Sequence, residues 1–508
     1  NDDSSGGDGG NLAGLGSNAG GILNSHVGST ATSWGYENNG NLWNNNNGSG
    51  AGTIASYANG DIISIAYDAD QGIIRFYKNG TIQTTGFTGI TADDYIPQVS
   101  LYNNGSSWIA NFGQDSSFSG NKTAQGNTDA SSLGDFYYTA PTGYKALCSA
   151  NLPPNVPSIV NPQKHFDTLL YTGNSSTQKI TGLEFKPDMI WFKSRTSTST
   201  HGIADSVRGR SKLFYPDTTQ AEETSSSTRD LVSFDDGGFT VGNPQVLSST
   251  NGNGLDIVAW CWKAGGAAVS NTDGTITSQV SANTEAGFSI VSFTGNATSG
   301  ATVGHGLNAT PKWFIIKERG NTNDWVVYHE GLGSSSGNTN VQFLNLTNDI
   351  GGGFAGGYNN TAPTSSVFSL GNSTETNRSS GNFIAYCWAE VPGFSKFGTY
   401  ESNNSSDGPY VDLGFQPKWI MMKPFDSSGD WQIYDTSRTP INKDDGNALY
   451  SNLNNSEASG FTMFDFLSSG FKVRNTGSGG INYSGTYIYM AFAEQPGTTP
   501  FATFPNAR

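Results

Sequence analysis

The sequence predicts an all-β protein built from tandem antiparallel β-sandwich domains of a jelly-roll-like type. Two observations lead to this prediction. Short apolar runs alternate with turns rich in glycine and asparagine, and a unit of about a hundred residues is repeated three times. No helical pattern extends beyond a turn or two. At 508 residues, the chain is long enough for roughly three or four domains.

The first segment, residues 1–150, is expected to form one β-sandwich. Strands are predicted over 62–67 and 73–77, joined by a turn at Asp68–Gly72, and over 96–102 and 108–112. The glycine-rich stretch 1–24 predicts no strand, so the first strand of this sandwich is expected to lie upstream or to be missing. Because the chain begins with asparagine, we expect it to be either processed or a fragment.

Each of the three repeats has an opening strand that begins with proline and ends with lysine: Pro187–Lys193, Pro311–Lys317 and Pro417–Lys423. Each also has a matching closing strand, at 257–264, 383–390 and 487–494. The predicted domains are repeat one at 165–267, repeat two at 287–394 and repeat three at 395–508, with a proline-rich linker at 151–164 and a hydrophilic linker at 268–286. Domain arrays of this kind usually extend, display and bind.

The first segment resembles the SPRY family of concanavalin-like sandwiches. The resemblance lies in Gly60-Asp-Ile-Ile, in Tyr67-Asp through Phe76-Tyr-Lys-Asn-Gly80, and in Tyr95-Ile-Pro through Asn111-Phe-Gly-Gln114. It implies a lectin-like β-sandwich whose binding loops vary, so it transfers no functional residue to this chain.

The three repeats resemble a domain of unknown function that is common in structural proteins of tailed phages, especially marine ones. The motifs include Gly304-His-Gly-Leu307, Phe383-Ile-Ala-Tyr-Cys-Trp-Ala-Glu390 and Gly470-Phe-Lys-Val-Arg474. The resemblance implies a virion component, often a tail or fibre protein, and carries no biochemical activity with it.

Composition argues against two classes of partner. The net charge of −16 and the lack of a basic stripe argue against nucleic acid, and no apolar run reaches the ~18 residues of a membrane span. Three cysteines argue against a disulfide framework. Cys261 and Cys387 occupy one repeat position at which repeat three has Ala491, so they are interpreted as small core residues, and Cys148 as similar.

Candidate chemistry is sparse, and we expect no cofactor and no metal site. Asp68–Gly72 resembles the start of a calcium loop without the remaining ligands, and a hairpin turn is the better interpretation. Asp235-Asp236 and Asp444-Asp445 could be glycosidase acids, but turn positions are favoured. His201 and Asp205 could form a base and its orienting group, yet repeats two and three have Trp325 and Trp431 at the histidine position.

One patch suits carbohydrate binding, since aromatic rings stack on sugars while amides bind hydroxyls. It consists of Trp34, Tyr36, Trp43 and Asn45, and Trp43 is expected to be exposed because it precedes a run of asparagines. The alternative interpretation is that Trp34 is sandwich core.

These inferences predict a virion surface protein of a tailed phage, a tail fibre or appendage rather than a head protein, and not an enzyme. Its expected partners are other virion proteins and host cell-surface carbohydrate or protein, and a homotrimer is expected by analogy with phage fibres. Two alternatives stay open: a head decoration or tail spacer protein with purely structural contacts, and a polysaccharide depolymerase.

Overall fold

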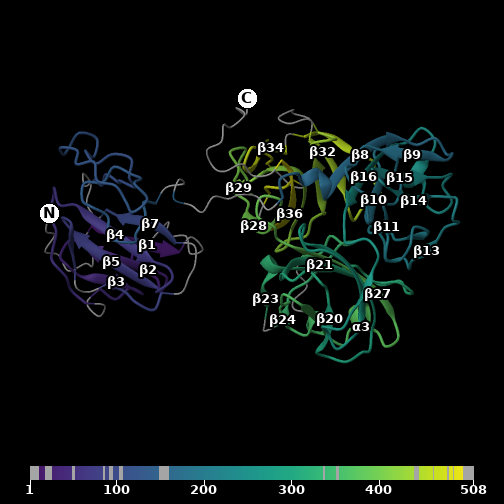
Figure 1. Ribbon diagram of the computed structural model, residues 1–508, viewed down its shortest axis with the longest axis horizontal. Coiled ribbons are helices and arrows are strands. Elements are labelled where there is room, and N and C mark those ends of the chain that lie inside the picture. Colours follow the sequence, from purple (N-terminus) through teal and green to yellow (C-terminus); the bar gives the residue numbers. More distant parts are fainter. Residues whose placement is uncertain are drawn as a thin grey trace. The chain divides into compact units, whose positions relative to one another are not determined.

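A computed structural model of the chain describes residues 11–17, 26–48, 52–83, 86–90, 95–101, 107–147, 151, 159–335, 338–349, 354–439, 446–461, 463–476, 480–483 and 485–495. The chain divides into two compact units, Asn1–Pro153 and Pro154–Arg508, which are described separately below (Figure 1). All pairs of named strands are antiparallel, and described helices span no more than four residues, which confirms the all-β prediction. No helix in the described ranges is long and apolar enough to cross a membrane.

The first unit contains two sheets, in the strand orders β3-β2-β1-β7 and β4-β5-β6. The strands are β1 (Leu12–Ser17), β2 (Ser33–Glu37), β3 (Leu42–Asn44), β4 (Ile63–Asp68), β5 (Ile73–Lys78), β6 (Thr81–Ile82) and β7 (Tyr95–Ser100). A buried cluster that includes Leu15, Trp34, Tyr36, Ile74 and Phe76 joins the two sheets.

Two expectations for this unit are wrong. Residues 12–17 form a central strand although the glycine-rich stretch predicted none: a Cβ atom on Gly14 would lie 1.8 Å from the Trp34 carbonyl oxygen, so glycine permits the close pairing of β1 and β2. Residues 108–112 form no strand, and Trp108 instead contacts the Tyr57 ring edge-on. The predicted turn after Asp68 is confirmed, because its carboxylate accepts the Gln71 amide at 3.0 Å.

In the second unit, each repeat builds a main sheet of the same order. The order is β11-β10-β16-β8 in repeat one, β22-β21-β27-β19 in repeat two and β31-β30-β36-β28 in repeat three. Their bounds are β8 (Phe166–Thr172), β10 (Met189–Ser194), β11 (Gly202–Asp205), β16 (Asp256–Trp262), β19 (Phe288–Thr294), β21 (Pro311–Glu318), β22 (Val326–His329), β27 (Asn382–Ala389), β28 (Ser395–Glu401), β30 (Gln416–Pro424), β31 (Gln432–Asp435) and β36 (Thr486–Gln495).

A smaller sheet covers one face of each main sheet. These sheets are β9-β15-β14, β20-β26 and β29-β35-β34. Their strands are β9 (Gln178–Thr181), β14 (Leu231–Asp235), β15 (Gly238–Val241), β20 (Ala301–Gly304), β26 (Val367–Leu370), β29 (Tyr410–Asp412), β34 (Phe464–Leu467) and β35 (Gly470–Val473). Each repeat is therefore a sandwich with a core of its own.

The remaining elements are short and border the sandwiches. The strands are β12 (Lys212–Leu213), β13 (Glu223–Thr224), β23 (Ser334–Ser335), β24 (Asn338–Thr339), β25 (Gln342–Phe343), β32 (Gly446–Tyr450) and β33 (Ala458–Phe461). The helical turns are η3 (Pro162–Lys164), α1 (Ser248–Asn251), η4 (Glu330–Leu332), α2 (Ala355–Tyr358) and α3 (Thr374–Asn377).

Residues 268–286 are more than the expected hydrophilic linker. They contain β17 (Val269–Asn271) and β18 (Ser278–Asn283), which extend the main sheet of repeat two beyond β19. In β18, Ser278, Val280 and Ser281 are buried while Gln279 is exposed. A half-buried strand rich in serine, glutamine and asparagine looks polar in sequence, which explains the error.

The opening strand of each repeat is buried on both faces. In β10, Ile190 and Phe192 point into the core of repeat one, whereas Met189 and Trp191 enter a second core. That second core is shared: it also contains Trp313 and Ile315 of repeat two, and Trp419 and Met421 of repeat three. Figure 1 shows the three repeats, blue-teal, green and yellow, arranged around this centre. The repeats are thus not separate beads of an extended array but parts of one body.

The repeated cysteines are core residues, as predicted. Cys261 in β16 and Cys387 in β27 are free thiols with no exposed surface, and burial raises the pKa of both well above the usual range for a thiol. Cys148 and Asp444-Asp445 lie outside the described residues.

Candidate functional site

The aromatic patch predicted to bind carbohydrate is buried. Trp34 and Trp43 are each 7% exposed, and Tyr36 has no exposed surface. The Trp43 indole donates a 2.7 Å hydrogen bond to Glu37, so the expectation that Trp43 is exposed is wrong. Asn45 is exposed, in a turn where its φ is +54°. The three rings present no free face on which a sugar could stack.

Their burial follows from their place in the sheet. Trp34 and Tyr36 lie on β2, whose five residues are all buried, and Trp43 is on the adjacent β3. The asparagine run marks the turn that follows β3, and not the environment of the tryptophan before it.

His201 and Asp205 have separate partners and form no catalytic pair. The His201 Nδ1 atom accepts a 2.9 Å hydrogen bond from the Trp191 indole, so its Nε2–H donates to the Tyr450 carbonyl, also at 2.9 Å. Burial holds the pKa of His201 well below its usual value, which keeps the ring neutral. Asp235, from the other acid pair, sits at a hairpin and accepts the Thr240 hydroxyl at 2.6 Å, as a turn residue would.

His201 instead belongs to a set of contacts that joins the repeats. Trp325 and Trp431 occupy the same repeat position, and their indoles donate to the carbonyls of Tyr215 and Phe343. A side chain of repeat one therefore donates to a carbonyl of repeat three. In the same way, repeat two donates to repeat one, and repeat three donates to repeat two. A head-to-tail contact used three times closes a ring.

The lysines that end the opening strands follow the same cycle. Lys193, Lys317 and Lys423 have no exposed surface, and their ammonium groups donate to carbonyl oxygens of the neighbouring repeat. The acceptors are Asn454 for Lys193, Thr219 for Lys317 and Thr347 for Lys423. Burial lowers the pKa of each lysine to about 8, and carboxylates nearby limit this shift.

Buried ion pairs reinforce two of the three interfaces. Asp205 binds Arg208 at 2.5 Å and accepts the hydroxyl of Tyr386 in repeat two at 2.7 Å. Asp435 binds Arg438 at 2.6 Å and accepts the indole of Trp260 in repeat one at 2.9 Å. Glu222 and Glu457 each bridge two arginines across the same interfaces: Arg208 and Arg319 bind Glu222, and Arg438 and Arg195 bind Glu457.

Besides His201, repeat one has another ionisable substitution inside this scaffold. Asp217 stands where repeats two and three have Asn345 and Asn452, whose side-chain oxygens accept the Trp325 and Trp431 amides. Burial raises the pKa of Asp217 to about 7, against the opposing effects of backbone hydrogen bonds and of Lys193.

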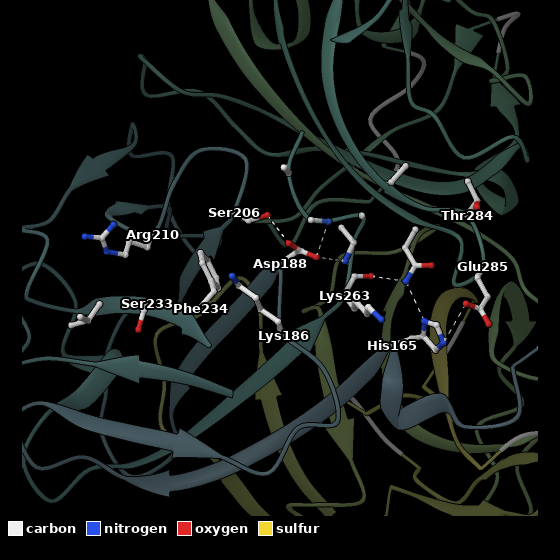
Figure 2. Close-up of a pocket in the computed structure, with 17 residues that line it drawn as sticks. His165, Lys186, Asp188, Ser206, Arg210, Ser233, Phe234, Lys263, Thr284 and Glu285 are labelled. Carbon is white, nitrogen blue, oxygen red and sulfur yellow. Dashed lines mark hydrogen bonds and ion pairs between the residues drawn. The ribbon is translucent and has the colours of Figure 1, made fainter. Parts of the chain in front are cut away.

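A groove beside repeat one is the strongest candidate for a binding site. It encloses about 1110 Å³ and runs between the end of β16, the turns around β10 and β11, the edge of β14 and the strand β18. Figure 2 shows Lys186, Lys263 and Arg210 along this groove, with the Phe234 ring among them. Sequence reasoning missed the groove because its lining comes from six separate segments.

Asp188 organises the floor of this groove. Its carboxylate is 5% exposed and accepts hydrogen bonds from the Ser206 hydroxyl at 2.8 Å and from the amides of Ala264 and Gly266 at 2.9 and 3.3 Å. These bonds fix the chain as it leaves β16. With its oxygens already bonded, Asp188 is a positioning group rather than a general acid.

His165 and Glu285 mark one end of the groove. The His165 ring lies 3.9 Å from the Glu285 carboxylate, and Nδ1 lies 3.1 Å from the Asn283 amide nitrogen. Burial lowers the pKa of His165, which the nearby Glu285 only partly offsets. No set of three or more His, Cys, Asp or Glu in the described ranges is placed to hold a metal ion.

Comparisons with known proteins agree with the division of the chain. A family model described as a domain of unknown function (DUF7483) matches residues 161–496, and a SPRY domain model matches residues 15–115. No curated protein and no solved structure matches the chain.

Proposed function

The chain belongs to the DUF7483 family, and on this basis we propose that it is a structural protein on the virion surface of a tailed phage. In this proposal it forms a tail fibre or appendage and makes non-covalent contact with glycan or protein on the host surface. Its other partners are neighbouring virion proteins.

The observation that carries the proposal is a difference between two parts of the second unit: the contacts that hold the repeats together recur from repeat to repeat, whereas the groove occurs beside repeat one. The titratable groups that first suggested catalysis, His201 and Asp205, hold the repeats together. The groove of repeat one, in contrast, is lined by three cations, Lys186, Arg210 and Lys263, at whose positions the other two repeats have uncharged residues. A rigid body with one distinct groove suits recognition.

The closed ring of repeats bears on the proposed homotrimer. The faces that three subunits would offer one another are already used within one chain, around the shared core. A trimer of this protein would therefore assemble through other surfaces. Its advantage would be avidity, since several weak grooves act on one host surface.

The spacer alternative also has an observation in its favour, because a body with a continuous core transmits force and holds distance well. Binding of the fluorescently labelled full chain to a panel of bacteria, measured by flow cytometry, separates the two roles. We expect binding at micromolar concentrations to some strains, lost after periodate treatment if the receptor is a glycan and after protease treatment if it is a protein.

Absence of binding to every strain, even with the chain clustered on beads, would favour the spacer. The same preparations test the depolymerase alternative. Shortening of purified bacterial polysaccharide by the chain, measured by size-exclusion chromatography, would replace an adhesin with an enzyme.

A further inference from the structure

We propose that the groove of repeat one binds the carboxylate groups of an acidic polysaccharide. This inference rests on the adhesin function proposed above and names the class of ligand. It starts from three cations, Lys186, Arg210 and Lys263, that come from separate segments and line one groove. Lys186 precedes β10, Arg210 follows β11, and Lys263 directly follows β16.

None of the three cations has an acidic partner among the residues that the structure describes. Elsewhere in the second unit, buried and half-buried arginines such as Arg195, Arg208 and Arg319 are paired with carboxylates. The chain carries 42 acidic residues against 26 lysines and arginines, so carboxylates are in excess. Unpaired cations gathered in a groove of such a protein indicate that an external anion is their partner.

The repeats provide an internal control for this interpretation. At the position of Lys186 the other repeats have Thr310 and Gln416, and at that of Lys263 they have Ala389 and Ala493. The position of Arg210, five residues after Asp205, corresponds to Ser334 and Pro440. All three cations are therefore absent from repeats that fold in the same way, so the scaffold does not require them.

Hydrogen bonds and close packing hold the backbone that lines the groove in place. Asp188 fixes the backbone of Ala264 and Gly266, as described above. At Gly265 a Cβ atom would lie 2.4 Å from the Ala282 carbonyl oxygen, so glycine lets the chain pass close to β18. The Gly265 amide is held by the Ser281 hydroxyl at 3.0 Å. The positions of the cations thus depend on a well-bonded floor.

The layout of the groove favours an extended chain of sugars over a single small anion. In the view of Figure 2, Arg210 lies on the opposite side of Phe234 from Lys263, so the positive charges are spread along the groove. The half-buried Phe234 ring offers an apolar surface between them, and Ser206, Ser233 and Thr284 add polar groups. A uronic acid polymer presents carboxylates at intervals, separated by sugar rings and hydroxyls, which matches this layout.

The experiment measures binding of the full chain to oligosaccharides of polygalacturonate, alginate and hyaluronan by isothermal titration calorimetry. We expect at least one of the three to bind, with dextran as a neutral comparison that does not. Because the contact is ionic and accessible to solvent, affinity should fall about tenfold or more between 50 and 300 mM salt. Absence of binding to all three uronic acid polymers would overturn the proposal.

A triple variant, Lys186→Gln, Arg210→Ser and Lys263→Ala, introduces residues that the other repeats already have and should lose at least about tenfold in affinity. The matched control, Lys179→Gln, Lys312→Gln and Lys396→Gln, removes the same charge outside the groove and should bind like the parent chain. Equal weakening of both variants would overturn the assignment to this groove, provided that their melting temperatures match that of the parent.

Two further arms separate this inference from its alternatives. Poly-L-glutamate or polyphosphate binding as tightly as the uronic acid polymers would replace the glycan with a general polyanion. Binding of the triple variant to host cells with unchanged affinity would contradict the assignment of the binding site to this groove, while leaving the adhesin function intact. Failure of the parent chain to bind cells would contradict the adhesin function itself.

Discussion

Repeat one meets its two neighbours through buried ion pairs, whereas repeats two and three meet through apolar and backbone contacts. Where repeat three has Asp435 and Arg438, repeat two has His329 and Leu332. The His329 Nε2–H donates to the Tyr489 carbonyl of repeat three at 3.2 Å. The next residue, Met490, occupies the repeat position of Trp260 and Tyr386 but has no polar group to bond with. No ion pair joins repeats two and three in the described ranges.

This difference shows that one scaffold accepts two kinds of interface. Three residues of the ion-pair interface are replaced together where repeats two and three meet. His329 replaces the aspartate, Leu332 replaces its arginine, and Phe425 replaces the arginine of the opposing repeat. Phe425 packs against the shared core. A buried ion pair can often be exchanged for apolar groups at little cost, provided that every member is exchanged. The buried charged residues at these interfaces are therefore structural, and their number is no sign of catalysis.

The largest effect on stability is expected when one member of a buried ion pair is removed. Asp435→Ala removes the closer of the two carboxylates that bind the buried Arg438 guanidinium, leaving Glu457 alone, and leaves the Trp260 indole without an acceptor. We expect the free energy of unfolding to fall by about 3–5 kcal/mol, measured by denaturant unfolding. Asp236→Ala, at an exposed turn, is the control and should change little. A loss for Asp435→Ala that is no greater than the control's would contradict the structural role.

The second prediction exchanges the whole pair. Asp435→His with Arg438→Leu gives repeat three the residues of repeat two, and Glu457 keeps Arg195 as a partner. Because no buried charge is orphaned, the double variant should recover stability to within about 2 kcal/mol of the parent. A double variant as unstable as Asp435→Ala would show that the two kinds of interface are not interchangeable.

The third prediction concerns pH at the interface of repeats one and three. Asp217 has a folded-state pKa of about 7, raised from 3.8, so the folded state holds a proton that the unfolded state releases. Its contribution to stability is therefore lost as pH rises from about 4 to 7 and stays lost above. Asp217→Asn should raise the free energy of unfolding by ~1–2 kcal/mol at pH 8.

The same substitution should have little effect at about pH 3, below both pKa values, where Asp217 is largely protonated in the folded and the unfolded state. Asp236→Asn serves as the control at each pH, since this side chain is exposed. A gain for Asp217→Asn that is independent of pH would place its origin in packing or hydrogen bonding instead of in the ionisation of the carboxyl group.

The smallest expected effect is that of Cys261→Ala. Ala491 occupies this position in repeat three, and both side chains are fully buried. Removal of the thiol should cost about 1 kcal/mol or less, measured by thermal unfolding. A much larger loss would mean that the sulfur has a role that the repeats do not share.

The sequence allowed much of the fold to be predicted, because the repeats could be compared with one another. The apolar run between proline and lysine, repeated three times, located β10, β21 and β30, and Ala491 identified Cys261 as a core residue. Strand β1 was missed because its glycines serve a close pairing that only the neighbouring strand reveals. The burial of Trp43 was missed because a local asparagine run says nothing about the sheet behind it.

The closure of the repeats and the groove could not be predicted from local patterns. A strand that is apolar on both faces must pack against a second surface besides its own sandwich. The apolar run Met189–Phe192 indicated such a surface, but not that the other two repeats provide it. Lys186, Arg210 and Lys263 are scattered over 78 positions and look like ordinary surface residues in sequence. Only the fold brings them to one groove.

The central claim is that the three repeats form one cooperative body, on which we propose that recognition is built. Hydrogen exchange of the full chain, followed by mass spectrometry, tests it directly by comparing β10, β21 and β30. We predict that Asp435→Ala lowers the opening free energy of all three strands equally, within about 1 kcal/mol, although β21 does not touch the substituted side chain. Loss of protection confined to repeats one and three, with β21 unchanged, would contradict the account.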